Sequence, residues 1–294
     1  MTAQDTVSHV DPFAHRLTRR GALNALAGFV ALALAACGSE KATTTSTEAT
    51  EATTPATRRA TKPATTGATT SETGAATSES DAVDCLTPPE ETGGPFPADG
   101  SNDNGDGEEA NVLDDVEVVR SDITASLDGS GVQPGVPMTL NITVADASTG
   151  CVPMPGAAVY IWHANRDGEY SVYNVGMNPG HSGDSFLRGV QIADDNGQLA
   201  FTTILPGRYP GRASHIHFAV YSDGTFANRL LTSQFAFDDE AVEALYASAD
   251  GYAGSIGGSQ NDQDNIFADG ADEQMLTVTG DAASGVTGTI TVAI

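Results

Sequence analysis

A pair of histidines, His215 and His217, lies in a short segment whose residue types favour a β-strand. The segment reads S-H-I-H-F-A-V over residues 214–220, and side chains two positions apart on a strand leave the same face. Both imidazoles can therefore bind one metal ion. Pairs of this kind also bind zinc or copper, or are merely hydrogen-bonded, so the pair alone leaves the metal open.

Two tyrosines precede the histidine pair in segments that predict strands and turns. Tyr170 follows a strand and a D-G turn in A-V-Y-I-W-H-A-N-R-D-G-E-Y-S, residues 158–171. Tyr209 lies at the Pro/Gly turn of T-T-I-L-P-G-R-Y-P-G-R, residues 202–212. Phenolate together with imidazole suits Fe(III) better than the commoner metals. The usual role of tyrosine in a β-rich protein is packing, and that role is expected of Tyr160, Tyr173 and Tyr221.

These segments resemble the intradiol ring-cleavage dioxygenases, a non-heme Fe(III) family that includes the catechol and protocatechuate dioxygenases. The family pattern V-x-I-W-x-A-x-x-x-G-x-Y-S matches residues 159–171, which implies that Tyr170 is a metal ligand. The pattern T-I-x-P-G-x-Y-P implies the same for Tyr209. The pattern R-x-x-H-I-H-F, here Arg212 to Phe218, makes His215 and His217 the remaining ligands.

The resemblance extends beyond the four ligands. The N-terminal motif E-T-G-G-P-F at 91–96 and the strand A-D-D-N-G-Q-L-A-F-T-T-I at 193–204 are also similar to family segments. The similarity runs from Glu91 to at least Phe237, with the ligands in the family's order.

The resemblance implies a reaction and a role for each site residue. A catechol chelates the ferric ion as a dianion, O2 attacks the activated ring, and cleavage between the two hydroxylated carbons gives a cis,cis-muconate-type diacid. Tyr209 is expected to leave the iron when the substrate binds and to supply a base, while the other three ligands stay. Arg212 and Gln234 match the polar residues that stabilise charge on the ring.

Other interpretations remain beside this one. A non-catalytic, transthyretin-like β-sandwich of carrier type would explain the strands and the acidic surface but not the Tyr, Tyr, His, His series. A zinc or copper enzyme using His215 and His217 would be colourless or blue, whereas phenolate-to-iron charge transfer gives a burgundy protein. The acidic segment 99–109 does not fit an EF-hand, so a solvated loop is expected there and calcium binding stays open.

Two further histidines are expected to have lesser roles. His163, beside Trp162, is predicted to cap a strand or to lie on the outer face of the fold. His181 lies in the loop N-P-G-H-S-G-D, where contact with substrate stays open because such loops commonly line a site on a β-scaffold.

Residues 16–37 read as an export signal. A twin-arginine pair precedes an apolar run from Gly21 to Ala36, which is shorter than the roughly 20 residues needed to span a membrane. The run ends in L-A-A-C, which resembles a bacterial lipobox and predicts cleavage after residue 36 with lipid attached to Cys37. The protein is therefore expected on the extracytoplasmic face of the bacterial cell membrane, where it is held only by this lipid anchor.

The rest of the chain divides into a tether and one domain. Residues 37–84 are rich in Thr, Ala, Ser, Glu and Pro and cannot bury a core, so a disordered tether is expected. Residues 85–294 suffice for one catalytic domain, and runs such as 138–145 and 287–294 predict an all-β, antiparallel β-sandwich. Only residues 240–247 read as a helix. Some family members dimerise through a helical domain that precedes the catalytic part. The tether occupies that place here, so this mode of dimerisation is not expected, and other oligomers stay open.

The charge of the chain limits its binding partners. With 39 acidic against 13 basic residues and a formal charge of −26, the chain is not expected to bind nucleic acid. The family resemblance implies that its partners are a small aromatic diol and O2. The sequence does not identify which catechol is the substrate.

The cysteines predict a disulfide. Once Cys37 carries lipid, Cys85 and Cys151 remain, and an oxidising exterior predicts a disulfide between them rather than two unpaired buried thiols.

Overall fold

The computed structural model describes residues 85, 87–176 and 178–294. The predicted export signal, the lipidation of Cys37 and the tether lie outside the described residues. Within the described part, no helix is both long and apolar enough to cross a membrane.

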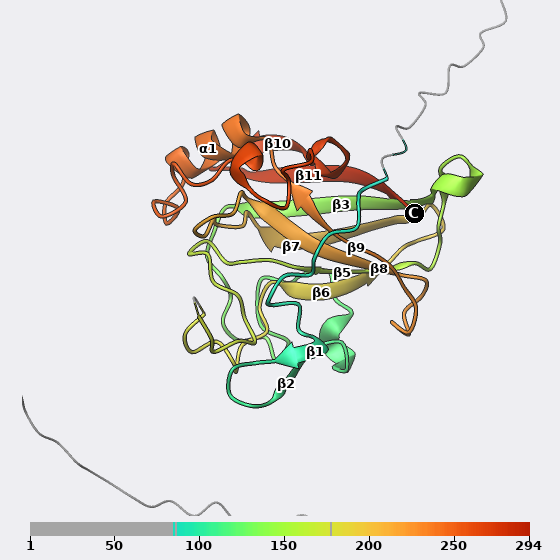
Figure 1. Ribbon diagram of the computed structural model, residues 1–294, viewed down its shortest axis with the longest axis horizontal. Coiled ribbons are helices and arrows are strands. Elements are labelled where there is room, and N and C mark those ends of the chain that lie inside the picture. Colours follow the sequence, from blue (N-terminus) through green and yellow to red (C-terminus); the bar gives the residue numbers. More distant parts are fainter. Residues whose placement is uncertain (1–84, 86, 177) are drawn as a thin grey trace, which may run out of the picture. The chain divides into compact units, whose positions relative to one another are not determined.

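Two stacked β-sheets form the domain (Figure 1). In the first sheet β10 pairs with β11 and β11 with β3, which also pairs with β4 and β7. Its strands are β3 (Pro137–Asp146), β4 (Val152–Pro153), β7 (Gln198–Ile204), β10 (Thr277–Asp281) and β11 (Gly285–Ala293). The second sheet has the order β6–β5–β8–β9 and consists of β5 (Ala158–Trp162), β6 (Arg188–Ile192), β8 (His215–Tyr221) and β9 (Arg229–Ala236). All pairs are antiparallel except β11 with β3, so the predicted antiparallel β-sandwich is confirmed with one parallel pair.

Helix is a minor component, as predicted. The single described α-helix is α1 (Asp239–Ser248), which begins after Asp238, whose carboxylate accepts a hydrogen bond from the Ala241 amide at 2.8 Å. Four 3₁₀ turns complete the helical part: η1 (Val116–Val118), η2 (Ala147–Thr149), η3 (Asn261–Gln263) and η4 (Asp272–Gln274). A small ribbon of β1 (Asp99–Asp103) and β2 (Glu109–Asn111) lies on the far side of the second sheet from the first (Figure 1).

The main core lies between the two sheets. Along β3 every second side chain is apolar and buried: Met138, Leu140, Ile142 and Val144. They pack in one cluster with the inward side chains of β8, which are Ile216, Phe218 and Val220. Because these three alternate with His215 and His217, both histidines must leave the opposite, outer face of the second sheet.

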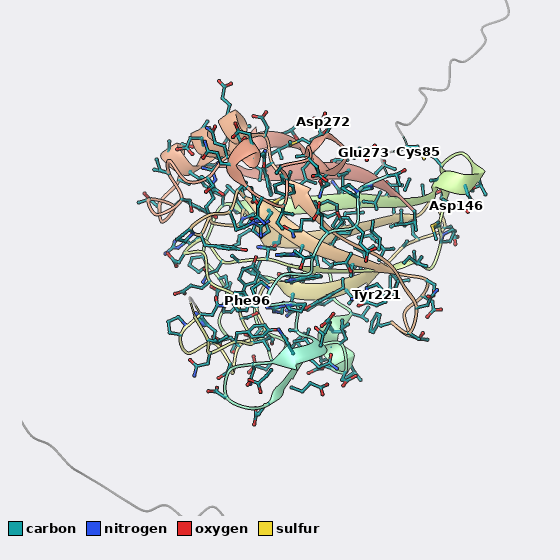
Figure 2. All side chains as sticks on the ribbon, viewed as in Figure 1. Cys85, Phe96, Asp146, Tyr221, Asp272 and Glu273 are labelled. Atoms are coloured by element: carbon teal, nitrogen blue, oxygen red, sulfur yellow. A yellow bond between two sulfur atoms is a disulfide. The ribbon has the colours of Figure 1, made fainter. Side chains whose placement is uncertain are left out.

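The outer face of the second sheet is also covered. All seven residues of β8 are buried, because residues 90–101, which we term the N-terminal strap, pass over this face. The Glu91 amide donates to the Thr232 carbonyl on β9 at 2.8 Å, and the Tyr160 hydroxyl of β5 donates to the Pro97 carbonyl at 2.8 Å. Figure 2 shows Phe96 and Tyr221 on this side of the sheet, and both belong to one buried cluster.

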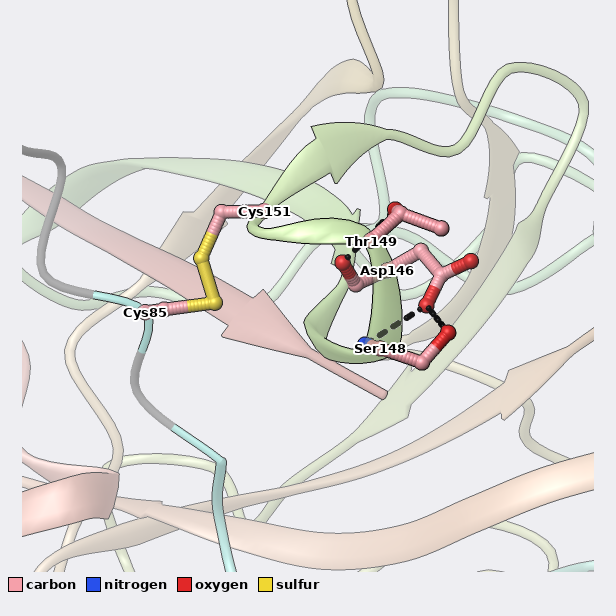
Figure 3. The surroundings of a disulfide bond; sticks show 5 residues. All are labelled: Cys85, Asp146, Ser148, Thr149 and Cys151. Carbon is pink, nitrogen blue, oxygen red and sulfur yellow. Dashed lines mark hydrogen bonds between the residues drawn. A yellow bond between two sulfur atoms is a disulfide. The ribbon is translucent and has the colours of Figure 1, made fainter.

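A disulfide fixes the beginning of the described chain. Cys85 is bonded to Cys151 with Cα atoms 5.8 Å apart, as the sequence predicted (Figure 3). Cys151 follows η2, a turn in which the Asp146 carboxylate accepts hydrogen bonds from the amide and hydroxyl of Ser148 at 2.8 and 2.6 Å. The bond therefore anchors the segment leading into the strap to the turn between β3 and β4.

Candidate metal centre

The four predicted ligands come from three segments at one end of the second sheet. His215 and His217 occupy β8, Tyr170 lies in the loop between β5 and β6, and Tyr209 lies in the turn between β7 and β8. The two tyrosine loops pack closely. Gly168 has φ +86°, and a Cβ there would lie 2.8 Å from the Arg208 carbonyl oxygen. The glycine of the D-G turn is needed for this approach.

The structure brings the four residues together. The Tyr170 hydroxyl is 3.2 Å and the Tyr209 hydroxyl 3.1 Å from His215 Nε2, and the two hydroxyl oxygens are 3.5 Å apart. The His217 ring centroid lies 4.8 Å from that of His215 and 6.1 Å from that of Tyr170. Atoms that bind one ion at about 2.1 Å lie roughly 3 Å from one another, so this spacing fits a shared coordination sphere.

Each histidine is held in a fixed orientation. His215 Nδ1 lies 2.8 Å from the Ala213 carbonyl oxygen, so Nδ1 carries the proton and the Nε2 lone pair faces the tyrosine hydroxyls. The His217 ring is stacked against Trp162, and Gly94 packs at its edge, where a Cβ would lie 3.1 Å from Cε1. His217 Nδ1 is buried without a hydrogen-bond partner among the described residues.

Burial sets the protonation state of the free site. It lowers the pKa of His215 to about 3, with the Arg212 charge adding to the effect, and it lowers that of His217 well below its usual value. Both imidazoles are therefore neutral, which is the form that binds metals. Burial also raises the pKa of Tyr170 well above its ordinary value and raises that of Tyr209, which Arg212 partly offsets. A bound cation is needed to ionise the two phenols.

The donor set itself selects among metals. Among the described residues no group of three or more His, Cys, Asp or Glu side chains could hold a metal ion. The two histidines therefore need the tyrosines to complete a site. Two hard phenolate oxygens with two imidazole nitrogens fit a trivalent iron, whereas structural and catalytic zinc sites use Cys, His, Asp or Glu. The residues present thus fit Fe(III).

Arg212 and Gln234, predicted from their motifs, both lie at this centre. Arg212 Nη1 is 3.3 Å from the Tyr209 hydroxyl and 3.3 Å from His215 Nε2, and its Nη2 donates to the Gln234 side-chain oxygen. The Gln234 amide nitrogen donates to the Thr92 carbonyl at 2.9 Å. Gln234 therefore links the arginine to the N-terminal strap.

The chain is similar to several known proteins. A family model described as "Dioxygenase" matches residues 116–265, which include all four candidate ligands. The chain belongs to the intradiol dioxygenase family. It is 31% identical to the catechol 1,2-dioxygenase of Acinetobacter baylyi over 182 residues, which cover 52% of this chain and 56% of that protein. It is 32% identical to the protocatechuate 3,4-dioxygenase beta chain of Burkholderia cepacia, covering 36% of this chain and 48% of that one.

The solved structure of a dioxygenase resembles this fold. The intradiol ring-cleavage dioxygenase of Tetranychus urticae superimposes with a TM-score of 0.56 at 24% identity, over 71% of this chain and 95% of that one. At that identity the likeness shows the fold. The chain spans about half the length of the catechol and protocatechuate enzymes named above.

Several other predictions can be compared with the structure. The expectation that His163 lies on the outer face of the fold is wrong, although the residue does directly follow the end of β5. It is buried, with Nε2 2.7 Å from the Thr203 hydroxyl and Nδ1 2.8 Å from the Ala164 carbonyl oxygen. His163 continues the alternation of β5. Like Val159 and Ile161 it points between the two sheets, where its partner Thr203 alternates with Leu199 and Phe201 on the inner face of β7. The packing roles expected of three tyrosines are confirmed by their burial at Tyr160, Tyr173 and Tyr221.

His181 is engaged by two carboxylates. Its Nδ1 lies 2.7 Å from Asp184 and its Nε2 3.1 Å from Glu169, so both ring nitrogens have partners. Burial lowers its pKa, but the two carboxylates outweigh burial and raise the pKa above the usual value.

Asp264 is a residue of the centre that no sequence motif indicated. It is fully buried and accepts hydrogen bonds from Arg212 Nε at 2.9 and 2.8 Å. Its local sequence, N-D-Q-D-N, resembles any polar loop, and its partner lies 52 residues earlier in the chain. Only the tertiary structure connects the two.

Proposed function

We propose that this protein is an intradiol dioxygenase that cleaves the ring of catechol-type aromatic diols with O2, using one Fe(III) held by Tyr170, Tyr209, His215 and His217. The convergence of Tyr170, Tyr209 and His215 donor atoms within 3.5 Å, in a chain of this family, carries the proposal. When bound, the ferric ion would draw electron density from the diol and so make its ring reactive toward O2.

Tyr209 is the ligand best suited to exchange with substrate. It is less buried than Tyr170, and the turn that carries it continues into Pro210 and Gly211. Tyr209 lines a cavity of about 410 Å³ whose walls include Gly254 and Gly257. The phenol therefore has room to move. As a phenolate, its oxygen would accept a proton from the incoming diol and become the neutral phenol. The negative charge is then left on the diol, where Arg212 can stabilise it, since Arg212 Nη1 lies 3.3 Å from the Tyr209 oxygen.

The remaining residues position and enclose the reacting groups. The Ala213 carbonyl keeps the His215 Nε2 lone pair directed at the centre. Trp162 covers one face of the His217 ring, and Gly94 packs at its edge. Arg212 presents its free Nη1 edge at the place where ring charge develops. Water is kept from His217, which is buried.

Purified, iron-loaded protein tests the proposal. We expect about one iron per chain, a burgundy colour, and O2 uptake with a panel of catechol, protocatechuate and hydroxyquinol that yields the corresponding ring-opened diacid. Tyr221→Phe, outside the donor set, serves as a control and should leave colour and uptake unchanged. Stoichiometric zinc or copper without iron in active protein would refute the metal assignment. Saturable catechol binding without O2 uptake would instead favour a carrier.

We also propose that the protein is exported and lipid-anchored through Cys37. The twin-arginine pair, the apolar run and L-A-A-C in residues 16–37 support this proposal. A Cys37→Ser variant should no longer incorporate a fatty-acid label and should leave the membrane fraction. Equal labelling of both proteins would exclude attachment at this cysteine.

A further inference from the structure

A fully buried carboxylate, Asp264, lies behind the arginine of the metal centre. Both its oxygens face Arg212 Nε, at 2.9 and 2.8 Å. Oδ2 also accepts from the Ala213 amide at 2.8 Å and Oδ1 from the Ile266 amide at 3.0 Å. Three N–H groups therefore surround one carboxylate, and a buried charge is tolerated only when it is paired and hydrogen-bonded in this way.

These bonds fix the direction of the guanidinium. A guanidinium is planar and rigid, so holding two of its nitrogens determines where the third points. Asp264 holds Nε, and Gln234 accepts from Nη2. The remaining nitrogen, Nη1, is then directed at the Tyr209 hydroxyl and His215 Nε2, each 3.3 Å away.

The same carboxylate is also linked to His215 through the backbone of Ala213. The Ala213 amide donates to Asp264, and the Ala213 carbonyl accepts from His215 Nδ1 at 2.8 Å. Asp264 thus fixes the backbone that orients His215 as well as the side chain of Arg212. In addition, its negative charge offsets the arginine charge, which would otherwise lie uncompensated beside the site of a trivalent cation.

We propose that Asp264 is a positioning residue for ring cleavage, acting through Arg212 and Ala213 without touching the substrate. The inference rests on the proposed function, because Arg212 is the group assigned to stabilise charge on the substrate. Asp264 sets the direction of Arg212 Nη1 and balances its charge, so that iron and the anionic diol bind next to a fixed, neutral ion pair.

The first test needs neither iron nor activity. In iron-free protein the Arg212 Nε–H signal, identified by NMR from its loss in Arg212→Ala, should exchange with solvent slowly because Asp264 covers it. Asp264→Asn should accelerate this exchange at least 10-fold. Asp99→Asn is the matched control: it also removes a carboxylate that faces an arginine, Arg229 at 3.5 Å, but that pair is away from the donors. Fast exchange in the wild-type protein would overturn the proposal even if Asp264→Asn failed to fold.

The second test is a double-mutant cycle on the iron-loaded enzyme. Asp264→Asn should lower kcat by about 10- to 100-fold with a smaller change in KM, as is typical of residues that orient a site. In the Arg212→Ala background the same substitution should cost less than about 3-fold, because only the contact with the Ala213 amide is left for it to remove. Full additivity of the two losses would show a merely structural role. If the wild-type protein cleaved no diol, the proposed function would fail while the exchange measurement still decided the role of Asp264.

Discussion

Trp162 lies flat against His217, with ring centroids 5.1 Å apart and ring planes inclined by 5°. The contact arises from strand pairing, since Trp162 on β5 is directly opposite His217 on β8. Gly94 of the strap packs at the edge of the same imidazole. The His217 ring therefore has little freedom to rotate, although Nδ1 makes no hydrogen bond among the described residues. Stacking on Trp162 thus holds the orientation of the His217 ring, as the hydrogen bond to the Ala213 carbonyl holds that of His215.

Replacing the indole should loosen this ligand. We expect Trp162→Leu to weaken iron binding by about 10-fold, because the flat contact is lost, whereas Trp162→Phe should keep most of the affinity. Competition with a chelator measures both. Since Trp162 is the single tryptophan of the chain, quenching of its fluorescence by added iron provides a second readout. A leucine variant that held iron as tightly as the wild-type protein would contradict this role.

Tyr209 and His215 should differ in what their loss removes. Tyr209→Phe is expected to retain iron, because three ligands remain, and to lower kcat by about 10²- to 10⁴-fold, because the proton acceptor is gone. His215→Ala should lose iron by more than about 100-fold in affinity, since no other described donor can take its place on β8. Iron analysis and single-turnover kinetics distinguish the two variants. Equal iron content and equal activity in both would refute the assigned roles.

Arg212 should act mainly on the rate. Its Nη1 faces the ligand atoms rather than an open surface, so we expect Arg212→Ala to lower kcat more than it raises KM. Steady-state kinetics with catechol under saturating O2 check this. An effect confined to KM would show that the arginine only anchors the substrate.

The four candidate ligands could be chosen from the sequence because each belongs to a continuous segment. Tyr170, Tyr209 and the histidine pair carry turn and strand patterns that are recognisable locally, and Arg212 is three residues from His215. Asp264 and Trp162 act through contacts between strands or loops distant in sequence. Alternation along a strand predicts which face a side chain leaves but not which strand lies opposite. For the same reason the parallel pairing of β11 with β3 was not predicted, although both strands were.

His163 gives the protein a pH-dependent stability. Burial lowers its folded-state pKa to about 4, below the unfolded value near 6.5. Between these values the unfolded chain binds more protons, so stability rises with pH across this window and is lost as the pH falls through it. The histidine contributes about 3 kcal/mol to the rise. His215 and His217 act in the same direction in iron-free protein.

Denaturant unfolding of iron-free protein at several pH values between 4 and 7 isolates the effect of His163. The variant His163→Gln keeps an amide that can bond both Thr203 and the Ala164 carbonyl, so it should fold and show a shallower dependence. An identical slope in the variant would mean that His163 does not titrate in this range.

The Cys85–Cys151 disulfide should stabilise both the domain and the metal centre. It closes a loop with a sequence separation of 66, for which the chain-entropy model gives up to about 4 kcal/mol. It also anchors the chain just before the strap, and the strap supplies the Thr92 carbonyl to Gln234 and packs Gly94 against His217. Loss of the disulfide should therefore loosen the contacts that the strap makes with Gln234 and His217, as well as the turn between β3 and β4.

We expect the paired variant Cys85→Ser/Cys151→Ser to lose about 2 to 4 kcal/mol of unfolding free energy and to bind iron more weakly. Deuterium exchange should rise first in the strap, residues 90–101, while β3 stays protected, because the strap is held to the sheet by few backbone hydrogen bonds. A reducing agent should produce the same changes in the wild-type protein and none in the variant, which already lacks the bond. Unchanged stability together with unchanged exchange in the strap would show that the crosslink does not support the site.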